Sequence, residues 1–326
     1  MKYATNPCAG TDRVLCLSQG NLNKEDIDLV IIPSMGNYPF NVNVRKGKVQ
    51  SKIEEEFPNA KYEIISHHLC HAYASVFSCD SNEGTFVTLD GAGTSVEDKY
   101  GQPVFCESSS IGYYNKEKKI FKYFPGNQGL NNFGHYYQSW SGFVYQNKME
   151  KQISLWDASV RETLPGKVMG LSAYGDKEKV DSLIKEYTIN TQSIPSIVFD
   201  SYYGDRRNEF FAVYKHLSPD DQARHLQTVF ESAILDYFNI LKDNDYLEGD
   251  LCLSGGCFLN VLSNTILKEH NIVENIHIPP FTNDSGLHFG AACYGAFKNN
   301  QNISLPDNIA LLGKEYSSEE IINVLG

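Results

Sequence analysis

Two histidines four residues apart are the side chains in this sequence that are best placed for chemistry. His67 and His71 follow an apolar stretch, and Ser66 stands before them where a helix N-cap would be. If a helix begins here, both imidazoles lie on one helical face and can reach a single cation. Asp90 ends the next predicted strand and can supply an oxygen ligand. The pattern predicts a metal site, although two structural histidines on a helix explain this spacing alone equally well.

Two glycine-containing segments have features of ligand-binding loops. The strand expected at 85–89 leads into Asp-Gly-Ala-Gly-Thr, in which Gly91 and Gly93 can expose backbone N–H groups to a phosphate. Without its neighbours, a plain hairpin would explain that segment equally well. Residues 165–175 contain glycines around an apolar core with Lys167 inside, which predicts a loop around a ligand or a simple turn.

A third glycine-containing segment lies at the mouth of a predicted helix. A strand expected over 250–254 leads through Gly255 and Gly256 into a helix expected over 257–268, with Asn260 in its first turn. Paired glycines let a ligand approach the backbone closely, and a helix N-terminus favours an anionic group. This segment is therefore a candidate nucleotide contact.

Alternating helices and strands must position these residues. Such alternation is typical of an α/β protein. Ser218 and Pro219 give the clearest helix start, because an N-cap residue is followed by proline at the first helical position. The other predicted elements are helices over 13–19 and 287–297, strands over 29–33, 62–65 and 276–280, and a β-hairpin over 110–124.

The composition indicates a folded protein with one or two apolar cores. Of the 326 residues, 41% are hydrophobic, which suffices for one large domain or two lobes. The formal charge of -12 disfavours binding to phosphate backbones, so we expect no nucleic acid partner. No run approaches the ~20 apolar residues of a membrane span, and we expect no membrane partner. Eight cysteines without a C-x-x-C pair are typical of reduced thiols in a cytoplasmic protein.

Five motifs in sequence order resemble those of the nodulation-type O-carbamoyltransferase family, which modifies nodulation factors and antibiotics. The chain is also similar to the tRNA threonylcarbamoyladenosine synthase subunit, which shares the fold and an HxxxH metal motif. Each motif is short, but together they span most of the chain. They are H-H-L-C-H-A at 67–72, L-D-G-A-G at 89–93, K-V-M-G-L-S-A-Y-G at 167–175, L-S-G-G-C-F-L-N at 253–260 and N-D-S-G at 283–286.

The resemblance implies an α/β, actin-like fold of two lobes, related to hexokinase and the Hsp70 ATPase, with a nucleotide in the cleft. We expect the first lobe at about 1–165 and the second at about 166–310. Compared with the family, we expect the chain to lack the first N-terminal β-hairpin. We also expect it to lack the C-terminal domain that makes carbamoyl-adenylate.

The resemblance also implies a reaction and a site. In the family, carbamoyl phosphate and ATP give a carbamoyl-adenylate, whose carbamoyl group passes to a hydroxyl of a small molecule or sugar. Carried over by position, the metal ligands are His67, His71, Asp90 and Asp284, a set of nitrogen and oxygen donors that suits Fe(II) or Zn. The nucleotide contacts are Gly91, Gly93, Lys167, Gly170, Ser254, Gly255, Gly256 and Asn260.

The sequence leaves three functions open. The chain could be the core of an ATP-dependent O-carbamoyltransferase of biosynthesis, completed by a separate protein that carries the C-terminal-type domain. It could instead be a catalytically incomplete module that binds nucleotide and metal together with partner polypeptides. A further possibility is an enzyme similar to the tRNA threonylcarbamoyladenosine synthase subunit. A sugar or acid kinase uses the same fold but gives no reason for the HxxxH spacing.

Overall fold

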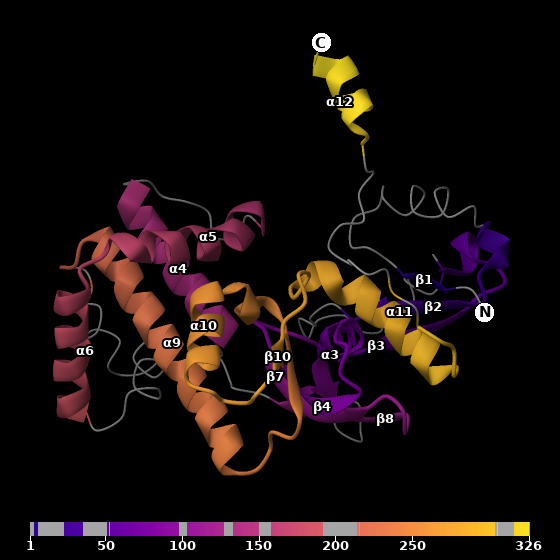
Figure 1. Ribbon diagram of the computed structural model, residues 1–326, viewed down its shortest axis with the longest axis horizontal. Coiled ribbons are helices and arrows are strands. Elements are labelled where there is room, and N and C mark those ends of the chain that lie inside the picture. The colour runs from indigo at the N-terminus through magenta and orange to yellow at the C-terminus, as the bar shows by residue number, and fades with distance from the viewer. Residues whose placement is uncertain are drawn as a thin grey trace.

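The computed structural model describes most of the chain as helices and sheets (Figure 1). It covers residues 3–5, 23–34, 51, 53–97, 103–126, 133–149, 158–191, 214, 216–303, 305 and 316–325, so the helix expected over 13–19 lies outside it. The strands are β1 Tyr3–Thr5, β2 Leu29–Pro33, β3 Lys61–Ile65, β4 Glu83–Leu89, β5 Ser95–Glu97, β6 Pro103–Cys106, β7 Ser109–Asn115, β8 Ile120–Gly126, β9 Asp250–Ser254 and β10 Ile276–His277. The α-helices are α3 His67–Ser78, α4 Phe133–Met149, α5 Ala158–Leu171, α6 Lys177–Thr191, α9 Pro219–Asp243, α10 Val261–Glu269, α11 Leu287–Lys298 and α12 Ser318–Leu325.

A five-stranded sheet forms the centre of the molecule, in the order β10-β9-β4-β7-β8. β4 and β9 run parallel, with Thr88 opposite Ser254, so the loops that follow these two strands leave the same edge of the sheet. β7 and β8 form the antiparallel hairpin that the sequence predicts. The strand predicted over 276–280 is shorter than expected, because only Ile276 and His277 pair with β9.

Helices cover both faces of this sheet. Side chains alternate along β4: Val87 and Leu89 belong to an apolar core with α4 and α9, whereas Phe86 packs with Val76 of α3. The same alternation occurs on β9 and is the period-2 pattern of a strand buried on both faces. Figure 1 shows the helical group α4, α5, α6, α9 and α10 on one side and α3 with α11 on the other. α3 is therefore held directly against the strands that carry Asp90 and Gly255 at their ends.

A smaller sheet, β1-β2-β3, is parallel and lies beyond α11. Ile31 of β2 packs with Leu287 and Ala291 of α11, while Val30 and Ile32 face the opposite side. The small residues Gly290 and Ala291 of α11 also pack on α3. This helix therefore joins the small sheet to the histidine-bearing helix.

Gly290 is the point of closest approach between α11 and α3. A Cβ atom at this position would stand 1.8 Å from the carbonyl oxygen of Cys70. Because that oxygen belongs to the backbone of the helix that carries His67 and His71, a side chain here must push the helix away. Gly290 thus sets the separation of the two helices.

We expect Gly290→Ala to lower the free energy of unfolding by about 1–3 kcal/mol, the usual cost of overpacking. Urea unfolding followed by circular dichroism measures the change. Gly166→Ala in α5 is the matched control, because no described atom outside the helix backbone lies within 4 Å of where its Cβ would stand. This control should instead stabilise the chain by about 0.5–1 kcal/mol. Equal effects of the two substitutions would contradict the role of Gly290.

Two further predicted segments differ from the structure. Residues 165–175 form no ligand loop, because α5 runs through Pro165 to Leu171 and a 3-10 helix follows over Ser172–Tyr174. Buried Leu164 and Val168, four residues apart, hold this helix in the core despite the proline. The helix expected over 257–268 is also wrong at its start: a 3-10 helix spans Gly256–Leu259, and α10 begins at Val261.

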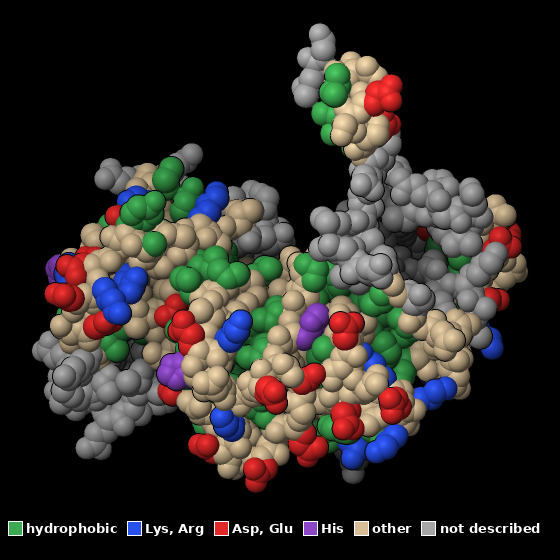
Figure 2. Space-filling view, in the orientation of Figure 1, with side chains coloured by type: hydrophobic (Ala, Val, Ile, Leu, Met, Phe, Trp, Pro, Cys, Tyr) green, Lys and Arg blue, Asp and Glu red, His purple; other side chains and the backbone are tan. Residues whose placement is uncertain are grey.

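The surface carries charged side chains of both signs, as the 28 basic and 40 acidic residues of the sequence lead one to expect. Figure 2 shows acidic side chains mixed with Lys and Arg over one face, rather than a block of one sign.

Of the cysteines in the described residues, Cys70, Cys252, Cys257 and Cys293 are buried, and Cys79 and Cys106 are half-buried; all are free thiols. No helix in the described part of the chain is both long enough and apolar enough to span a membrane.

Candidate metal centre

The N-terminal turn of α3 presents both histidines as the sequence predicts. Ser66 is the N-cap, and its hydroxyl accepts a hydrogen bond of 3.2 Å from the backbone N–H of Leu69. His67 and His71 are 3% and 0% exposed, and their imidazoles point to the same side of the helix. The cap thus fixes where the helix starts and therefore which residues share that face.

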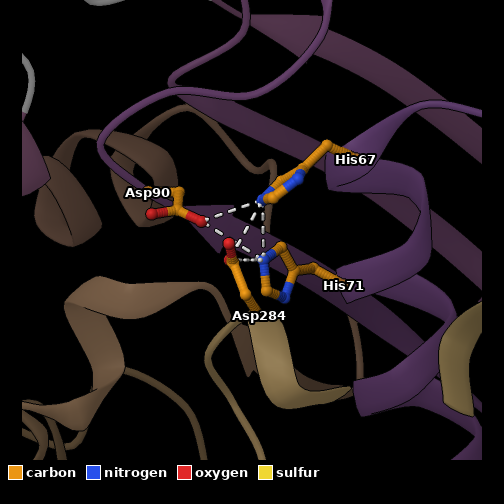
Figure 3. A group of neighbouring side chains, drawn as sticks. All are labelled: His67, His71, Asp90 and Asp284. Atoms are coloured by element: carbon orange, nitrogen blue, oxygen red, sulfur yellow. Dashed lines mark hydrogen bonds and ion pairs between the residues drawn. The ribbon is translucent and has the colours of Figure 1, made fainter. Parts of the chain in front are cut away.

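Two carboxylates complete the group from distant parts of the chain. Asp90 follows β4 directly, and Asp284 opens the 3-10 helix Asp284–Gly286 before α11. Asp90 reaches the site because β4 lies next to α3, and Asp284 reaches it because α11 packs on α3. Figure 3 shows the four side chains converging on one point. The structure therefore brings together all four residues that the sequence proposed as ligands.

The four donor atoms lie close to one another. All of them fall within 4.8 Å of each other. His67 Nε2 lies 3.2 Å from His71 Nε2, 3.2 Å from Asp90 Oδ2 and 3.3 Å from Asp284 Oδ1. His71 Nε2 lies 3.2 Å from Asp90 Oδ2 and 3.5 Å from Asp284 Oδ1. Each Nε2 atom therefore has three polar neighbours at nearly equal distances.

Hydrogen bonds alone do not account for this arrangement. A ring nitrogen has one N–H or one lone pair in the ring plane, so it can serve one partner well and not three. Ligands placed at about 2.0–2.2 Å around a tetrahedral ion stand roughly 3.3–3.6 Å apart, close to the spacings seen here. The donor set of two imidazoles and two carboxylates thus fits a divalent ion such as Zn or Fe(II).

The electrostatics of the group also favour a cation at its centre. Burial acts to lower the pKa of His67, but hydrogen bonds to Asp284 and Asp90 outweigh it and raise that pKa to about 10. Burial acts to raise the pKa of Asp284, but hydrogen bonds to His67 and His71 lower it to about 2. The same balance holds the pKa of Asp90 well below 3.8. Without an ion, a proton on His67 therefore supplies the positive charge between the two carboxylates.

His68 lies beside the group but does not belong to it. Its ring is fully buried, and Nδ1 lies 3.2 Å from the hydroxyl of Ser110. Burial is the largest influence on its pKa, which is lowered to about 3. Gly93 packs against this ring, because a Cβ there would stand 2.5 Å from His68 Cδ2. His68 is therefore a buried neighbour of the four ligands and not one of them.

The glycine turns that follow β4 and β9 lie next to the four side chains. A Cβ on Gly256 would stand 3.2 Å from Asp90 Oδ1. Gly255 has a φ of 99°, and its amide donates to the carbonyl of Thr282 at 2.8 Å. The amide of Gly93 donates to the carbonyl of Glu107 at 2.6 Å, and that of Gly91 to its neighbour Asp90 at 2.6 Å.

Two further proposed nucleotide contacts, Ser254 and Asn260, have side-chain partners within the protein. The buried hydroxyl of Ser254 lies 3.0 Å from that of Thr88 on β4. Asn260 is the N-cap of α10 rather than part of its first turn, and its side-chain oxygen accepts from the backbone of Ser263 at 3.1 Å. Its amide also pairs with that of Gln227 through bonds of 3.0 and 2.9 Å. Both side chains are therefore fixed in position.

Lys167 and Gly170 lie on α5 instead of on a loop. The ammonium of Lys167 stands 5.3 Å from the ring centre of Tyr145, and both Lys167 and Gly170 are exposed. No described atom outside the helix backbone lies within 4 Å of a Cβ on Gly170, so the surface there is open. Their contact with a nucleotide stays a prediction.

Glu107 is a buried carboxylate that sequence reasoning missed. It stands between β6 and β7, is 2% exposed, and accepts hydrogen bonds from Ser66, Thr94 and Tyr123. Its neighbours in the sequence form no periodic pattern and no motif that would mark it. Only the fold brings it next to the first turn of α3.

Comparison with known proteins gives a family match over most of the chain. Residues 37–293 match the family described as Carbamoyltransferase N-terminus. Nodulation protein U of Sinorhizobium fredii is 35% identical over 78 residues, which are 23% of this chain and 14% of that protein. An uncharacterized protein of Methanocaldococcus jannaschii is 24% identical over 290 residues, which are 83% of this chain and 47% of that protein. The chain thus spans less than half the length of these curated relatives.

The fold also matches a solved structure. HypF of T. kodakarensis superposes with a TM-score of 0.50 at 12% sequence identity, covering 90% of this chain and 44% of that chain. At this identity the likeness concerns the fold alone. The predicted α/β, actin-like fold is confirmed. The division into lobes near residue 165 stays a prediction.

Proposed function

The chain belongs to the family described as Carbamoyltransferase N-terminus, which matches residues 37–293. From this membership we propose that it transfers a carbamoyl group to a hydroxyl. The donor is carbamoyl-adenylate, made from carbamoyl phosphate and ATP, and the acceptor is a small molecule or sugar. The oxygen of the acceptor forms a bond to the carbamoyl carbon while the bond from that carbon to the phosphate oxygen breaks; AMP leaves with the bonding electrons, and the hydroxyl proton passes to solvent. The convergence of His67, His71, Asp90 and Asp284 on one point is the observation that carries this proposal.

We assign these four residues as ligands of Zn or Fe(II). When bound, such an ion supplies Lewis-acid chemistry, which polarises the carbamoyl carbonyl. His67 and His71 supply neutral nitrogen donors, and Asp90 and Asp284 supply the negative charge that balances a divalent cation. The N-cap of α3 fixes both imidazoles before the substrate binds, so substrate binding energy is not needed to order them.

The exposure of the ligands gives a direction for substrate approach. Asp284 is 53% exposed, whereas the side chains of His67, His71 and Asp90 are 3%, 0% and 17% exposed. Groups that reach this centre must therefore come from the side of Asp284. On this proposal the acceptor hydroxyl and the carbamoyl group meet there.

The nucleotide is proposed to lie along the glycine turns after β4 and β9. Gly256 adjoins Asp90, so a phosphate bound at this turn would stand near a carboxylate. A cation between the two groups offsets their repulsion, which links nucleotide binding to metal binding. The proposed contacts are Gly91, Gly93, Lys167, Gly170, Ser254, Gly255, Gly256 and Asn260.

The experiment that tests this function supplies preformed carbamoyl-adenylate with a carbon-13 carbamoyl group to the purified chain. The chain is loaded with Zn or Fe(II) and offered a panel of hydroxyl acceptors, and mass spectrometry follows the label. We expect one bound ion per chain and a labelled carbamate ester on at least one acceptor.

Other results would favour the alternatives. An ion-bound chain that transfers no label, even with a family C-terminal domain added, supports a binding module that acts with partner polypeptides. Transfer of a threonylcarbamoyl group to tRNA from added threonylcarbamoyl-adenylate, with release of AMP, supports an enzyme similar to the tRNA threonylcarbamoyladenosine synthase subunit. A chain that retains no ion from either metal overturns the assignment of the ligands.

A further inference from the structure

The buried side chain of Glu107 lies between the first turn of α3, which carries the histidines, and the loop after β4, which carries Asp90. Glu107 Oε2 accepts hydrogen bonds from Ser66 Oγ at 2.7 Å and from the backbone N–H of Thr94 at 3.2 Å. Glu107 Oε1 accepts from Tyr123 Oη at 2.5 Å. Among the residues that the structure describes, no ion pair with Lys or Arg neutralises Glu107. Hydrogen bonds therefore hold this carboxylate away from water.

Two of these donors act directly on the histidine-bearing helix. Ser66 is its N-cap, and the hydroxyl that binds Glu107 also accepts from the N–H of Leu69. Thr94 Oγ1 accepts from the backbone N–H of His67 at 2.9 Å. Glu107 is thus one hydrogen bond away from both groups that fix the first turn of α3.

The backbone around Glu107 holds the loop that carries Asp90. Gly93 donates to the carbonyl of Glu107 at 2.6 Å, and Glu107 donates to the carbonyl of Thr94 at 2.9 Å. The N–H of Asp90 donates to the carbonyl of Ser108 at 3.1 Å. The two imidazoles and the Asp90 carboxylate are therefore braced against the same short segment of chain.

We propose that Glu107 is a positioning residue that sets the geometry of the metal centre. It does so by tying the first turn of α3 to the Asp90 loop, and the proposal rests on the proposed metal-binding function. Ligand distances must lie within about 0.2 Å of their ideal values, so a small shift of α3 relative to Asp90 weakens binding. Groups that orient metal ligands are typically worth about 10–100-fold in metal affinity.

The chain offers a matched control at the other end of the same strand pair. Glu83, at the start of β4, accepts from Asn115 Nδ2 at 2.6 Å and from Tyr113 Oη at 3.2 Å. Glu83 and Tyr113 therefore form the same type of hydrogen bond as Glu107 and Tyr123, but Glu83 is exposed and lies at the strand end opposite to Asp90.

The test compares Glu107→Ala and Tyr123→Phe with Glu83→Ala and Tyr113→Phe. The zinc dissociation constant is measured by competition with a chromophoric chelator, and thermal unfolding of the metal-free proteins is measured in parallel. We expect Glu107→Ala to bind zinc about 10–100-fold more weakly and Tyr123→Phe several-fold more weakly, with both controls within about twofold of wild type. Bound Co(II) should also show a changed visible spectrum in Glu107→Ala.

The measurements separate this inference from the proposed function. A wild-type chain that binds neither Zn nor Fe(II) overturns both. Wild-type binding with an unchanged constant in Glu107→Ala, even if that variant melts earlier, overturns the positioning role alone. Should Glu107→Ala not fold, an unchanged constant in the nearly isosteric Tyr123→Phe overturns it.

Discussion

Replacing His71 by alanine is expected to weaken zinc binding by about 100-fold or more, beyond the effect typical of groups outside the ligand set. His71 is fully buried, and its Nε2 lies 3.2 Å from both His67 Nε2 and Asp90 Oδ2. Its loss removes one of four donors and leaves a gap that no described side chain fills. At limiting metal, carbamoyl transfer should fall in the same proportion.

His71 is a better probe than His67 because the metal-free protein depends on His67 for charge balance. The raised pKa of His67 keeps a proton between Asp90 and Asp284 when no ion is bound. His67→Ala removes that proton and should also destabilise the fold, whereas His71→Ala leaves it in place.

Inductively coupled plasma mass spectrometry of dialysed protein and chelator competition measure the result. His270→Ala is the control, because His270 is exposed at the end of α10. Equal zinc contents in His71→Ala and wild type would contradict the ligand assignment.

Zinc affinity is expected to rise steeply with pH, by about tenfold per unit from pH 7 toward 10, where binding displaces one proton. Burial acts to lower the pKa of His67, and the hydrogen bonds to Asp284 and Asp90 raise it to about 10. At neutral pH the ion must therefore compete with a proton on that imidazole.

Calorimetry at pH 7 in buffers of different ionisation enthalpy should detect the release of about one proton per zinc bound. Chelator competition at pH 6.5, 7.5 and 8.5 then gives the slope, and His270→Ala should show the same slope as wild type. Affinity that does not change with pH would contradict a protonated His67 in the metal-free state.

Above neutral pH, the free energy of unfolding of the metal-free protein should fall as the pH rises, whereas its zinc affinity increases. The pKa of His67 is higher in the folded chain than its ordinary value near 6.5, so its contribution is complete below that value and is lost as pH rises toward about 10. Asp284, with its pKa lowered from 3.8 to about 2, contributes above 3.8 and loses that contribution as pH falls. The cluster therefore stabilises the metal-free fold most between these limits.

The sequence predicts the histidine half of the site because its signals are local. Ser66 as an N-cap and the spacing of His67 and His71 determine which face of α3 carries the imidazoles. The strand that ends before Asp90 is also marked by its own β-branched and aromatic residues. These features need no knowledge of distant residues, and each of them is found in the structure.

Asp284 could be assigned only through the resemblance to a family. Nothing in its own neighbourhood indicates a ligand, and its place beside His67 depends on the packing of α11 on α3 at Gly290. Neither the family resemblance nor a local sequence pattern indicated a role for Glu107. Its function follows from three hydrogen bonds to residues 13 to 41 positions away, which sequence spacing does not reveal.

Two of the errors in element prediction have opposite causes. The glycines within 165–175 predict a loop or turn, but burial of Leu164 and Val168 holds α5 in the helical state and outweighs the hydrogen bond that Pro165 removes. Asn260 was placed inside a helix, although asparagine is a preferred N-cap and its extended backbone, with φ of -78° and ψ of 91°, starts α10 instead. Tertiary packing decided the first case, and a local signal was misjudged in the second.

The order of strands in the central sheet has a consequence for how the chain folds during synthesis. β9 inserts beside β4, and the facing residues Thr88 and Ser254 are separated by 166 positions. Until β9 leaves the ribosome, β4 is an open edge with apolar side chains on both faces, the kind of surface that aggregates or recruits chaperones. Asp284 emerges later still, so a nascent chain acquires its fourth ligand only after the sheet can close. Metal uptake would thus mark the completion of folding.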